Sequence, residues 1–291
     1  MIRMKSFLTI AMMLGGVAVR AGAVELQPAT AEAWLDYVRH AGEGMQARLD
    51  GRKPFLWVDD IPERALRVRH GEVVVAPAAG TGTEAVPNGL IHDWIGAVFI
   101  PNTTIESLLA VVHDYDRYKE IYKPVVTDSR LIDAGASDQE FSMIWQHHVM
   151  LVNAAMRGRY RAQDFSIGPH RLYSVVDATT LQQIEEYGHP GEHLLPPDTG
   201  GGFIWRAHSI SRYEERDGGV YLELEAIVLS RDIPSSLQWL VNPVVNHLSI
   251  NSLTTTLRQT RQAVGTQQAA IATDSASVPT LRAAVKWHGT R

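Results

Sequence analysis

The sequence contains no cysteine. This absence excludes disulfide bonds, thiolate catalysis and every zinc site built on cysteine ligands. It also excludes a lipid-modified cysteine near the N-terminus. Without disulfides, a chain of 291 residues must be stabilised by its own hydrophobic core, and a chain of this length is long enough to form one.

Long apolar runs and blocks of a single charge are also missing. No segment after the N-terminal region is continuously apolar over the ~20 residues that a membrane-spanning helix needs. The formal net charge is −5 and both signs are mixed along the chain. Because no long basic cluster is present, the sequence argues against nucleic acid as a partner.

The N-terminus has the pattern of a cleavable export signal. Arg3 and Lys5 precede an apolar run at residues 6–19, and Ala21-Gly22-Ala23 supplies the small-x-small site that signal peptidase reads. The run is too short to span the ~30 Å of bilayer hydrocarbon as a stable helix. The alternative is an N-terminal anchor that is never cut. We expect residues 1–23 to be removed and the mature protein to be periplasmic or secreted.

The first part of the remaining chain alternates between helical and strand patterns. Residues 31–49 carry apolar side chains at helical spacing, residues 66–75 indicate a hairpin, and residues 91–100 indicate a strand. A helix is expected to start beside Thr103, which can cap the first amides while Glu106 reaches back to it.

From residue 131 to residue 229 the apolar period changes to two, which is typical of strands. Short turn-rich connections between the strands favour an antiparallel meander. The predicted strands are residues 140–149, 154–164, 171–180, 202–213 and 220–229.

Alternation divides these strands into two faces. One face carries Arg157, Arg159, Arg161, Arg206, Arg212, Glu223 and Glu225, and we expect it to be solvated. The other face mixes large aromatic residues with small residues at mid-strand positions. Small residues leave volume, which either a ligand or a closely packed helix must fill, because empty space forfeits packing contacts.

The last helical segment carries an unusual mixture of apolar and hydroxyl side chains. A short apolar turn precedes Asn242-Pro243, where a helix can begin. Beyond it, one broad face contains Val245, Leu248, Ser249, Ser252, Leu253, Thr256 and Thr260. Buried hydroxyls need partners, so these face a partly polar cavity or bond back to their own helix. We expect one domain at residues 24–264 and a disordered tail at residues 265–291.

Several motifs resemble bacterial START-like proteins of the SRPBCC or Bet v 1-like superfamily. His92-Asp93-Trp94-Ile95-Gly96 is similar to the strand before the first grip helix in that family, and Asp114-Tyr115-Asp116-Arg117-Tyr118 to the end of that helical segment. The closing strands and the turn into the last helix are matched by residues 202–205, 218–221 and 229–234. The resemblance implies an α+β helix-grip fold, in which a curved antiparallel sheet wraps around a long C-terminal helix over an internal apolar cavity.

Together, the resemblance and the two-faced sheet predict an exported protein that binds or transfers a lipid, sterol-like or polycyclic apolar molecule. No cofactor or metal is expected, transient membrane contact is open, and the oligomeric state is not predicted. The candidate ligand-binding residues are Phe141, Met143, Trp145, His147, Met156, Tyr160, Ser174, Val176, Trp205, Ser209, Leu224, Ala226, Leu248, Ser252 and Thr256.

Other functions remain as alternatives. A cyclase- or hydrolase-type enzyme on the same scaffold would use His147 and Tyr160 as acid and base if they meet across the cavity. The loop at residues 188–193 holds two histidines and a glutamate, but its Gly and Pro residues favour a solvated surface over a metal site. The arginine row at residues 157–161 favours a solvated sheet face over contact with an anionic membrane.

Overall fold

The computed structural model describes residues 24–135, 138–149, 152–232 and 235–277. The predicted signal segment lies outside these ranges. In the described part, helices flank a large sheet, and they fall into an N-terminal group, a short central group and one long C-terminal helix. They are α1 (Pro28–Leu49), the 3-10 helix η1 (Trp57–Asp60), α2 (Pro62–Arg69), α3 (Ile105–Val112), η2 (Tyr115–Arg117), α4 (Tyr118–Ile121) and α5 (Ser235–Ser277).

The strands are long in the centre of the sheet and short at its margins. They are β1 (Val24–Glu25), β2 (Val74–Pro77), β3 (Thr83–Val86), β4 (Gly89–Pro101), β5 (Val126–Ala134), β6 (Asp138–Val149), β7 (Val152–Gly168), β8 (Arg171–Glu185), β9 (His193–Leu194), β10 (Thr199–Gly200), β11 (Arg206–Arg216) and β12 (Gly219–Arg231).

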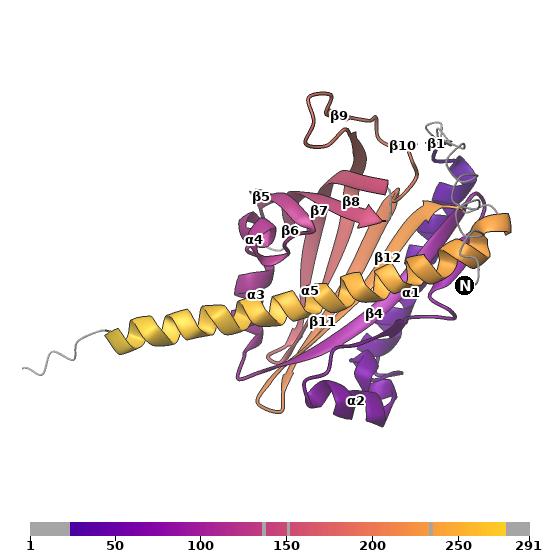
Figure 1. The fold of residues 1–291 in the computed structure, drawn as a ribbon. Helices are drawn as coiled ribbons and strands as arrows, with labels where there is room; N and C mark the ends of the chain where they lie inside the picture. The colour runs from indigo at the N-terminus through magenta and orange to yellow at the C-terminus, as the bar shows by residue number, and fades with distance from the viewer. Residues whose placement is uncertain (1–23, 136–137, 150–151, 233–234, 278–291) are drawn as a thin grey trace, which may run out of the picture.

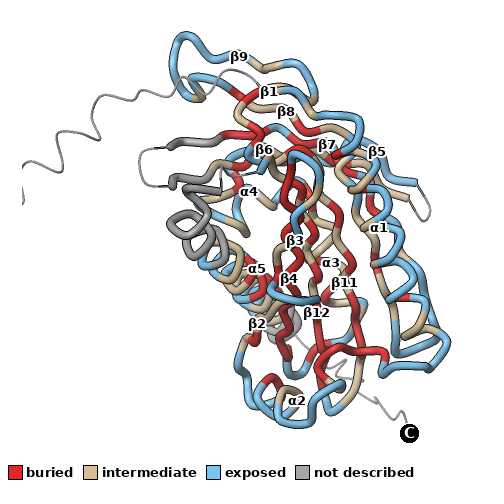
Figure 2. The backbone as a smooth tube through the Cα atoms, turned by 90° about the vertical axis from the view of Figure 1, so that its right-hand side faces the viewer, coloured by how far each residue is buried: buried red, intermediate tan, exposed pale blue. Residues whose placement is uncertain are grey.

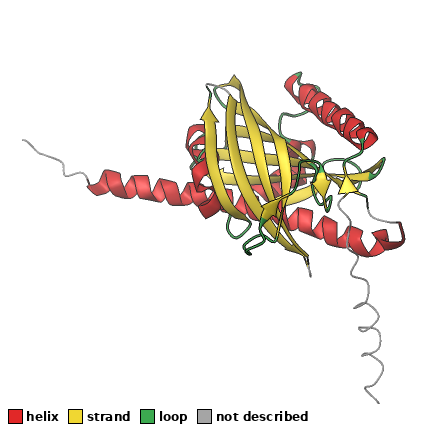
Figure 3. Ribbon diagram, turned by 90° about the horizontal axis from the view of Figure 1, so that it is seen from above, coloured by secondary structure: helices red, strands yellow, loops and turns green. Residues whose placement is uncertain are grey.

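One antiparallel sheet of ten strands forms the body of the molecule, with the order β2-β4-β12-β11-β8-β7-β6-β5. Strand β3 pairs with β4, and β9 pairs with β8. Strands β6, β7, β8, β11 and β12 form the predicted meander, and β5, which was not predicted, pairs with β6 at its edge. β4 pairs along its whole length with β12, so the strand before α3 lies beside the strand that leads into α5. The sheet curves, and α5 crosses its inner face (Figures 1 and 3).

Helix α5 is longer than the sequence pattern predicts. It begins at Ser235 and runs for 43 residues to Ser277, passing through the Asn242-Pro243 position where a separate start was expected. The prediction of a disordered tail from residue 265 is therefore wrong up to residue 277. Alanine and glutamine, which are common in this stretch, favour helix, and that preference outweighs the polar composition. The rest of the predicted tail lies outside the described residues.

The predicted hairpin at residues 66–75 is wrong. Its first residues belong to α2, which starts with Pro62 in the first helical turn, where proline is well tolerated. The helix ends before Gly71, whose positive φ of 91° suits a residue without a side chain. Strand β2 then follows and pairs with β4.

The start of α3 is capped by a neighbouring residue instead of the expected one. Thr104 is the N-cap, and its hydroxyl accepts a hydrogen bond from the backbone N–H of Ser107. Thr103 is buried and donates to the carbonyl of Pro101. The carboxylate of Glu215 on β11 accepts a hydrogen bond from the N–H of Ile105 in the first turn of α3.

The outer face of the sheet is only partly solvated, which corrects the sequence prediction. The three arginines on β7 are exposed as expected. Arg212, Glu223 and Glu225 are buried, because α1 and η1 cover the outer face of β4, β11 and β12. In Figure 2 these central strands are largely red and lie between α5 on one side and α1 on the other. The alternating pattern identified the two faces but could not reveal that both are covered.

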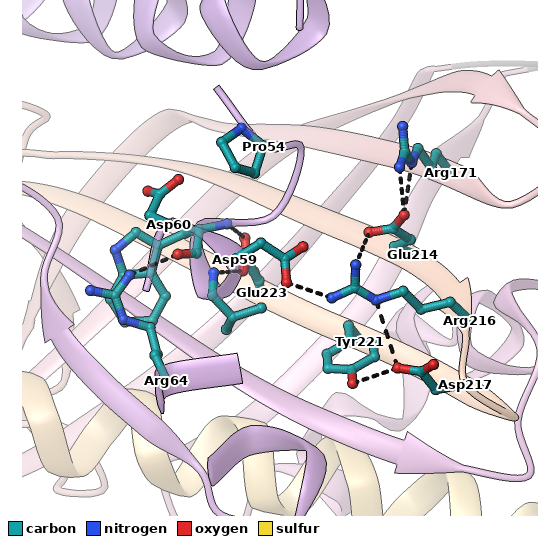
Figure 4. A network of polar contacts seen from close by, with 12 residues as sticks. Pro54, Asp59, Asp60, Arg64, Arg171, Glu214, Arg216, Asp217, Tyr221 and Glu223 are labelled. Atoms are coloured by element: carbon teal, nitrogen blue, oxygen red, sulfur yellow. Dashed lines mark hydrogen bonds and ion pairs between the residues drawn. The ribbon is translucent and has the colours of Figure 1, made fainter. Parts of the chain in front are cut away.

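Glu223 ties this N-terminal layer to the sheet. Its carboxylate is fully buried and accepts hydrogen bonds of 3.0 and 2.8 Å from the backbone N–H groups of Trp57 and Val58. At the end of the same face, Arg216 pairs with Asp59 at 2.7 Å and with Glu214 at 3.4 Å (Figure 4). None of the helices in the described ranges is long and apolar enough to cross a membrane.

Candidate functional site

A cavity of about 540 Å³ lies between the inner face of the sheet and α5. Its walls come from β6, β7, β8, β11 and β12, from the segment that connects α3 to β5, and from α5. This volume lies within the range of roughly 300–1,000 Å³ that is typical of small-molecule sites. Most of the lining side chains are aliphatic or aromatic, so the site is suited to an apolar ligand.

The cavity exists because α5 approaches the sheet closely on one side only. Gly96 on β4 lets the helix approach, since a Cβ atom there would lie 2.7 Å from Leu257 Cδ1 and 3.1 Å from Leu253 Cγ. On the other side, Ala162 and Ala207 line open space. Small residues therefore play both roles considered from the sequence: close helix packing at β4 and a hollow above β7 and β11.

Aromatic side chains form one wall of the cavity. Phe141 stacks between Tyr115 and Tyr160, with ring centroids 4.1 and 5.0 Å apart. Trp145 Nε1 donates a hydrogen bond of 3.1 Å to the hydroxyl of Tyr160. Burial raises the pKa of Tyr160 well above its ordinary value. This wall is therefore uncharged at neutral pH and presents mainly ring surface.

The hydroxyl groups of α5 face the cavity, and some are also satisfied locally. Ser252, Thr255, Thr256 and Thr260 all belong to the lining. Thr260 Oγ1 donates to the carbonyl of Thr256 at 2.9 Å and lies 3.0 Å from the hydroxyl of Tyr122. Thr260 therefore lines the cavity and also bonds back to its own helix, so burying its hydroxyl group does not carry the cost of an unpaired polar group.

A polar corner interrupts the apolar lining at Asp164. Asp164 on β7 lies directly opposite Ser174 on β8 in the sheet register, so the serine hydroxyl donates to Asp164 Oδ1. His113 follows the end of α3, and its Nε2 lies 3.0 Å from Asp164 Oδ2. All three residues line the cavity.

Hydrogen bonds keep this carboxyl group acidic. Burial alone would raise the pKa of Asp164, but the hydrogen bonds from His113 and Ser174 outweigh burial and hold the pKa below its ordinary value. Next to it, burial raises the pKa of Tyr213 to about 12, against hydrogen bonds with Ser174 and Ser211. At neutral pH the corner therefore contains one carboxylate, held between the imidazole of His113 and the hydroxyl group of Ser174, with the neutral hydroxyl group of Tyr213 beside it.

Most of the candidate ligand-binding residues meet at this cavity, although their role in binding remains a prediction. The lining includes Phe141, Met143, Trp145, Tyr160, Ser174, Val176, Ser209, Leu224, Ala226, Leu248, Ser252 and Thr256. They come together because side chains alternate along a strand, and the pairing of the strands places every second residue of each on the inner face.

Two candidates lie away from the cavity surface. Trp205 was assigned to a strand, but β11 begins only at Arg206. The chain before it is irregular, and Trp205 packs with Trp34 and Ile91 in a separate cluster. Met156 is buried among Trp145 and its neighbours behind the lining. His147 belongs to β6, but its side chain lies outside what the structure describes.

From the sequence, Ser174 was a candidate residue, but Asp164, His113 and Tyr213 were not. Asp164 alternates in step with Tyr160 and Ala162, so it was expected on the covered face of the sheet. A carboxylate on an otherwise apolar face could have indicated a functional residue. Tyr213 likewise continues the parity of Ser209. For His113 the sequence offers no comparable signal, because its position depends on how α3 ends above the sheet.

The loop with two histidines does not assemble a metal site. Glu192 accepts a hydrogen bond from the backbone N–H of Gly188 at 2.9 Å, and His193 Nε2 lies 3.5 Å from Glu185. Within the described ranges, no cluster of three or more His, Asp or Glu residues could hold a metal ion.

Comparisons with known proteins give structural similarity alone. No protein-family model matches the sequence, and no curated protein matches it. The STAR-related lipid transfer protein from Xanthomonas axonopodis is 17% identical with a TM-score of 0.44, covering 66% of this chain and 98% of that chain. Human STARD10 is 11% identical with a TM-score of 0.40, covering 72% and 82%. The Zhui aromatase/cyclase from Streptomyces is 13% identical with a TM-score of 0.36, covering 60% and 96%.

The topology of the chain itself identifies the fold. A curved antiparallel sheet, a meander from β5 to β8, and a long C-terminal helix across the inner face form the START-like helix-grip fold. The α+β prediction and the expected order of its parts are therefore confirmed. A fold of this kind does not by itself fix a function.

Proposed function

We propose that this protein is an exported carrier that binds a lipid, sterol-like or polycyclic molecule between its sheet and α5. The cavity of about 540 Å³ is the observation that supports this proposal. Transfer from water into such a site is worth about 0.8 kcal/mol for each buried CH₂ group. A modest apolar body therefore binds well without any charged anchor. Export rests on the N-terminal sequence pattern alone.

Mass spectrometry tests the carrier function directly. The full chain is expressed in a bacterial host with its own signal segment, purified without detergent and extracted with organic solvent. The proposal predicts a bound apolar molecule at near-stoichiometric amount, or uptake of one when emptied protein is incubated with lipid vesicles. A preparation that carries no extractable lipid and takes up none from vesicles would contradict it.

A variant with a filled cavity tests whether the ligand occupies the hollow, and a substitution on the opposite face serves as its control. Ala207 lines the cavity on β11, and Ala207→Phe would place a ring in the hollow. The exposed sheet residue Arg159 on β7 offers a control substitution, Arg159→Gln, on the opposite face. We expect the first variant to lose the bound molecule and the second to retain it.

An enzyme on the same scaffold is the second candidate, and His113 supports it better than the residues chosen from the sequence. The 3.0 Å contact between His113 Nε2 and Asp164 would orient the imidazole as an acid or base at the cavity surface. Tyr160 is a poor base, because burial raises its pKa. In an assay with medium-chain p-nitrophenyl esters, His113→Asn would abolish turnover and retain binding. Equal loss of both would argue against catalysis.

A further inference from the structure

We propose that the cavity selects its ligand by head-group charge. A head group that donates a hydrogen bond and carries no negative charge is accepted at Asp164, and a carboxylate or phosphate head group is rejected. This inference rests on the carrier function proposed above, and it adds a specificity-determining residue and a ligand class.

The geometry leaves part of the Asp164 carboxylate free for a ligand. A carboxylate has roughly four acceptor positions. Ser174 donates to Oδ1 and His113 Nε2 contacts Oδ2 at 3.0 Å, so each oxygen keeps acceptor capacity. The side chain is 23% exposed and lines the cavity. A ligand hydroxyl or ammonium group that reaches this corner therefore finds a fixed, oriented acceptor.

The carboxylate is ionised at neutral pH, because its pKa is lowered. The hydrogen bonds from His113 and Ser174 keep its pKa below the ordinary value in spite of burial. An ionised carboxylate accepts hydrogen bonds and donates none. It attracts a donor and repels an anion, and the low-dielectric surroundings strengthen both effects.

No lysine or arginine among the described residues lines the cavity to pair with an anionic head group. Nε2 of His113 is already engaged by Asp164, and the second lining histidine, His208, is engaged by Asp177 at 2.7 Å. Because an unpaired charge buried in an apolar site is strongly unfavourable, a fatty-acid carboxylate or a lipid phosphate would have to remain outside or lose its charge.

Matched single-chain probes separate head-group selection from general hydrophobicity. Dodecan-1-ol, dodecylammonium, dodecanoate and dodecyl phosphate each compete with a fluorescent apolar dye at pH 8, on the full chain and on Asp164→Asn. The readout is the ratio of the dodecanoate Kd to the dodecan-1-ol Kd. Comparing this ratio between the two proteins cancels the difference in hydrophobicity of the probes.

We expect Asp164→Asn to lower this ratio by about tenfold to a hundredfold, since hydrogen bonds to charged groups are worth that much. Dodecylammonium should lose affinity in the variant, and dodecyl phosphate should gain it. Asp133 is an exposed carboxylate on β5, so the control Asp133→Asn should leave the ratio unchanged. Should Asp164→Asn fail to fold, Asp164→Thr gives the same test with a residue that favours strands.

The outcomes distinguish the two proposals. If neither the dye nor any probe binds, the carrier function itself fails. If the dye and dodecan-1-ol bind but the ratio is the same in the full chain and Asp164→Asn, the carrier function stands and head-group selection by Asp164 is wrong.

Discussion

The two faces of the same sheet differ in how they are packed and in where they carry charge. The inner face leaves a hollow lined by aromatic rings, small residues and one accessible carboxylate, Asp164. The outer face of β4, β11 and β12 is solid and contains several buried charges beneath α1 and η1. The comparison shows that alternating strands can hold a ligand site on one side while charged contacts fasten a covering layer to the other.

The buried charges of the outer face compensate one another only in part. Arg212 lies 2.5 Å from Glu225 and 3.6 Å from Glu223, so one cation serves two carboxylates. Nearby, Tyr37 of α1 donates a hydrogen bond of 2.9 Å to Asp93 Oδ2. Asp93 Oδ1 is buried and has no hydrogen-bond partner among the described residues. Besides its apolar packing, the layer is thus held by several buried charged contacts.

The largest expected effect is the loss of Arg212. Arg212→Met removes the cation that Glu223 and Glu225 share and leaves both carboxyl groups buried without it, which should lower the free energy of unfolding by about 3–5 kcal/mol. Urea denaturation followed by circular dichroism measures the change.

The matched control lies on the exposed part of the same face. Arg159 pairs with Glu140 at 3.3 Å in a partly exposed position, so Arg159→Met should cost less than about 1 kcal/mol. Equal costs for the two substitutions would show that Arg212 is not the compensating charge of a buried layer.

The second effect concerns pH. Burial, and then the neighbouring Glu225 carboxylate, raise the pKa of Asp93 to about 7, against the opposing influence of Tyr37, Arg212 and His208. Between about pH 4 and pH 7 the folded chain therefore holds a proton that the unfolded chain has lost. The contribution of Asp93 to stability should fall by on the order of 2–4 kcal/mol as pH rises through this range.

Asp93→Asn checks this sign. Asparagine cannot ionise and can still accept the hydrogen bond from Tyr37. The variant should be more stable than the natural chain at pH 8 and about equal to it at pH 4, as measured by urea denaturation at each pH. A parallel pH dependence in the two proteins would exclude Asp93 as the titrating group.

The smallest expected change in the free energy of unfolding comes from placing the same substitution, Ala→Phe, on each face of the sheet. Ala97 on β4 is fully buried in the solid outer core, so Ala97→Phe should destabilise the protein by about 1–3 kcal/mol through overpacking. Ala207→Phe enters the hollow and should change the free energy of unfolding by less than about 1 kcal/mol. Equal destabilisation at both positions would mean that the inner face is as tightly packed as the outer one.

The fold was largely predictable from the sequence because period-two alternation from Phe141 to Val228 fixes both strands and faces. The same parity brought most candidate residues to the cavity. The same alternation could also have identified Asp164 as a residue of the inner face. The position of His113 and the close approach of α5 at Gly96 depend on tertiary packing, which local pattern does not encode.

The covered outer face was the main feature that the sequence pattern did not predict. Arg212 and Glu223 were predicted to be solvated because charged residues are usually exposed. Their burial follows from α1 and η1 docking on the sheet, a contact between segments more than a hundred residues apart. Trp205 was misplaced for a related reason, since the alternation was extended into an irregular segment before β11.

Fluorescence quenching of Trp145 tests the central claim that an apolar ligand occupies the hollow. Trp145 lines the cavity, so a bromine-labelled long-chain alcohol bound there should quench its emission. We predict saturable quenching in the natural chain that is largely lost in Trp145→Phe, with Trp205→Phe as the control that retains it. The same quenching with and without Trp145, or none in either protein, would contradict the account.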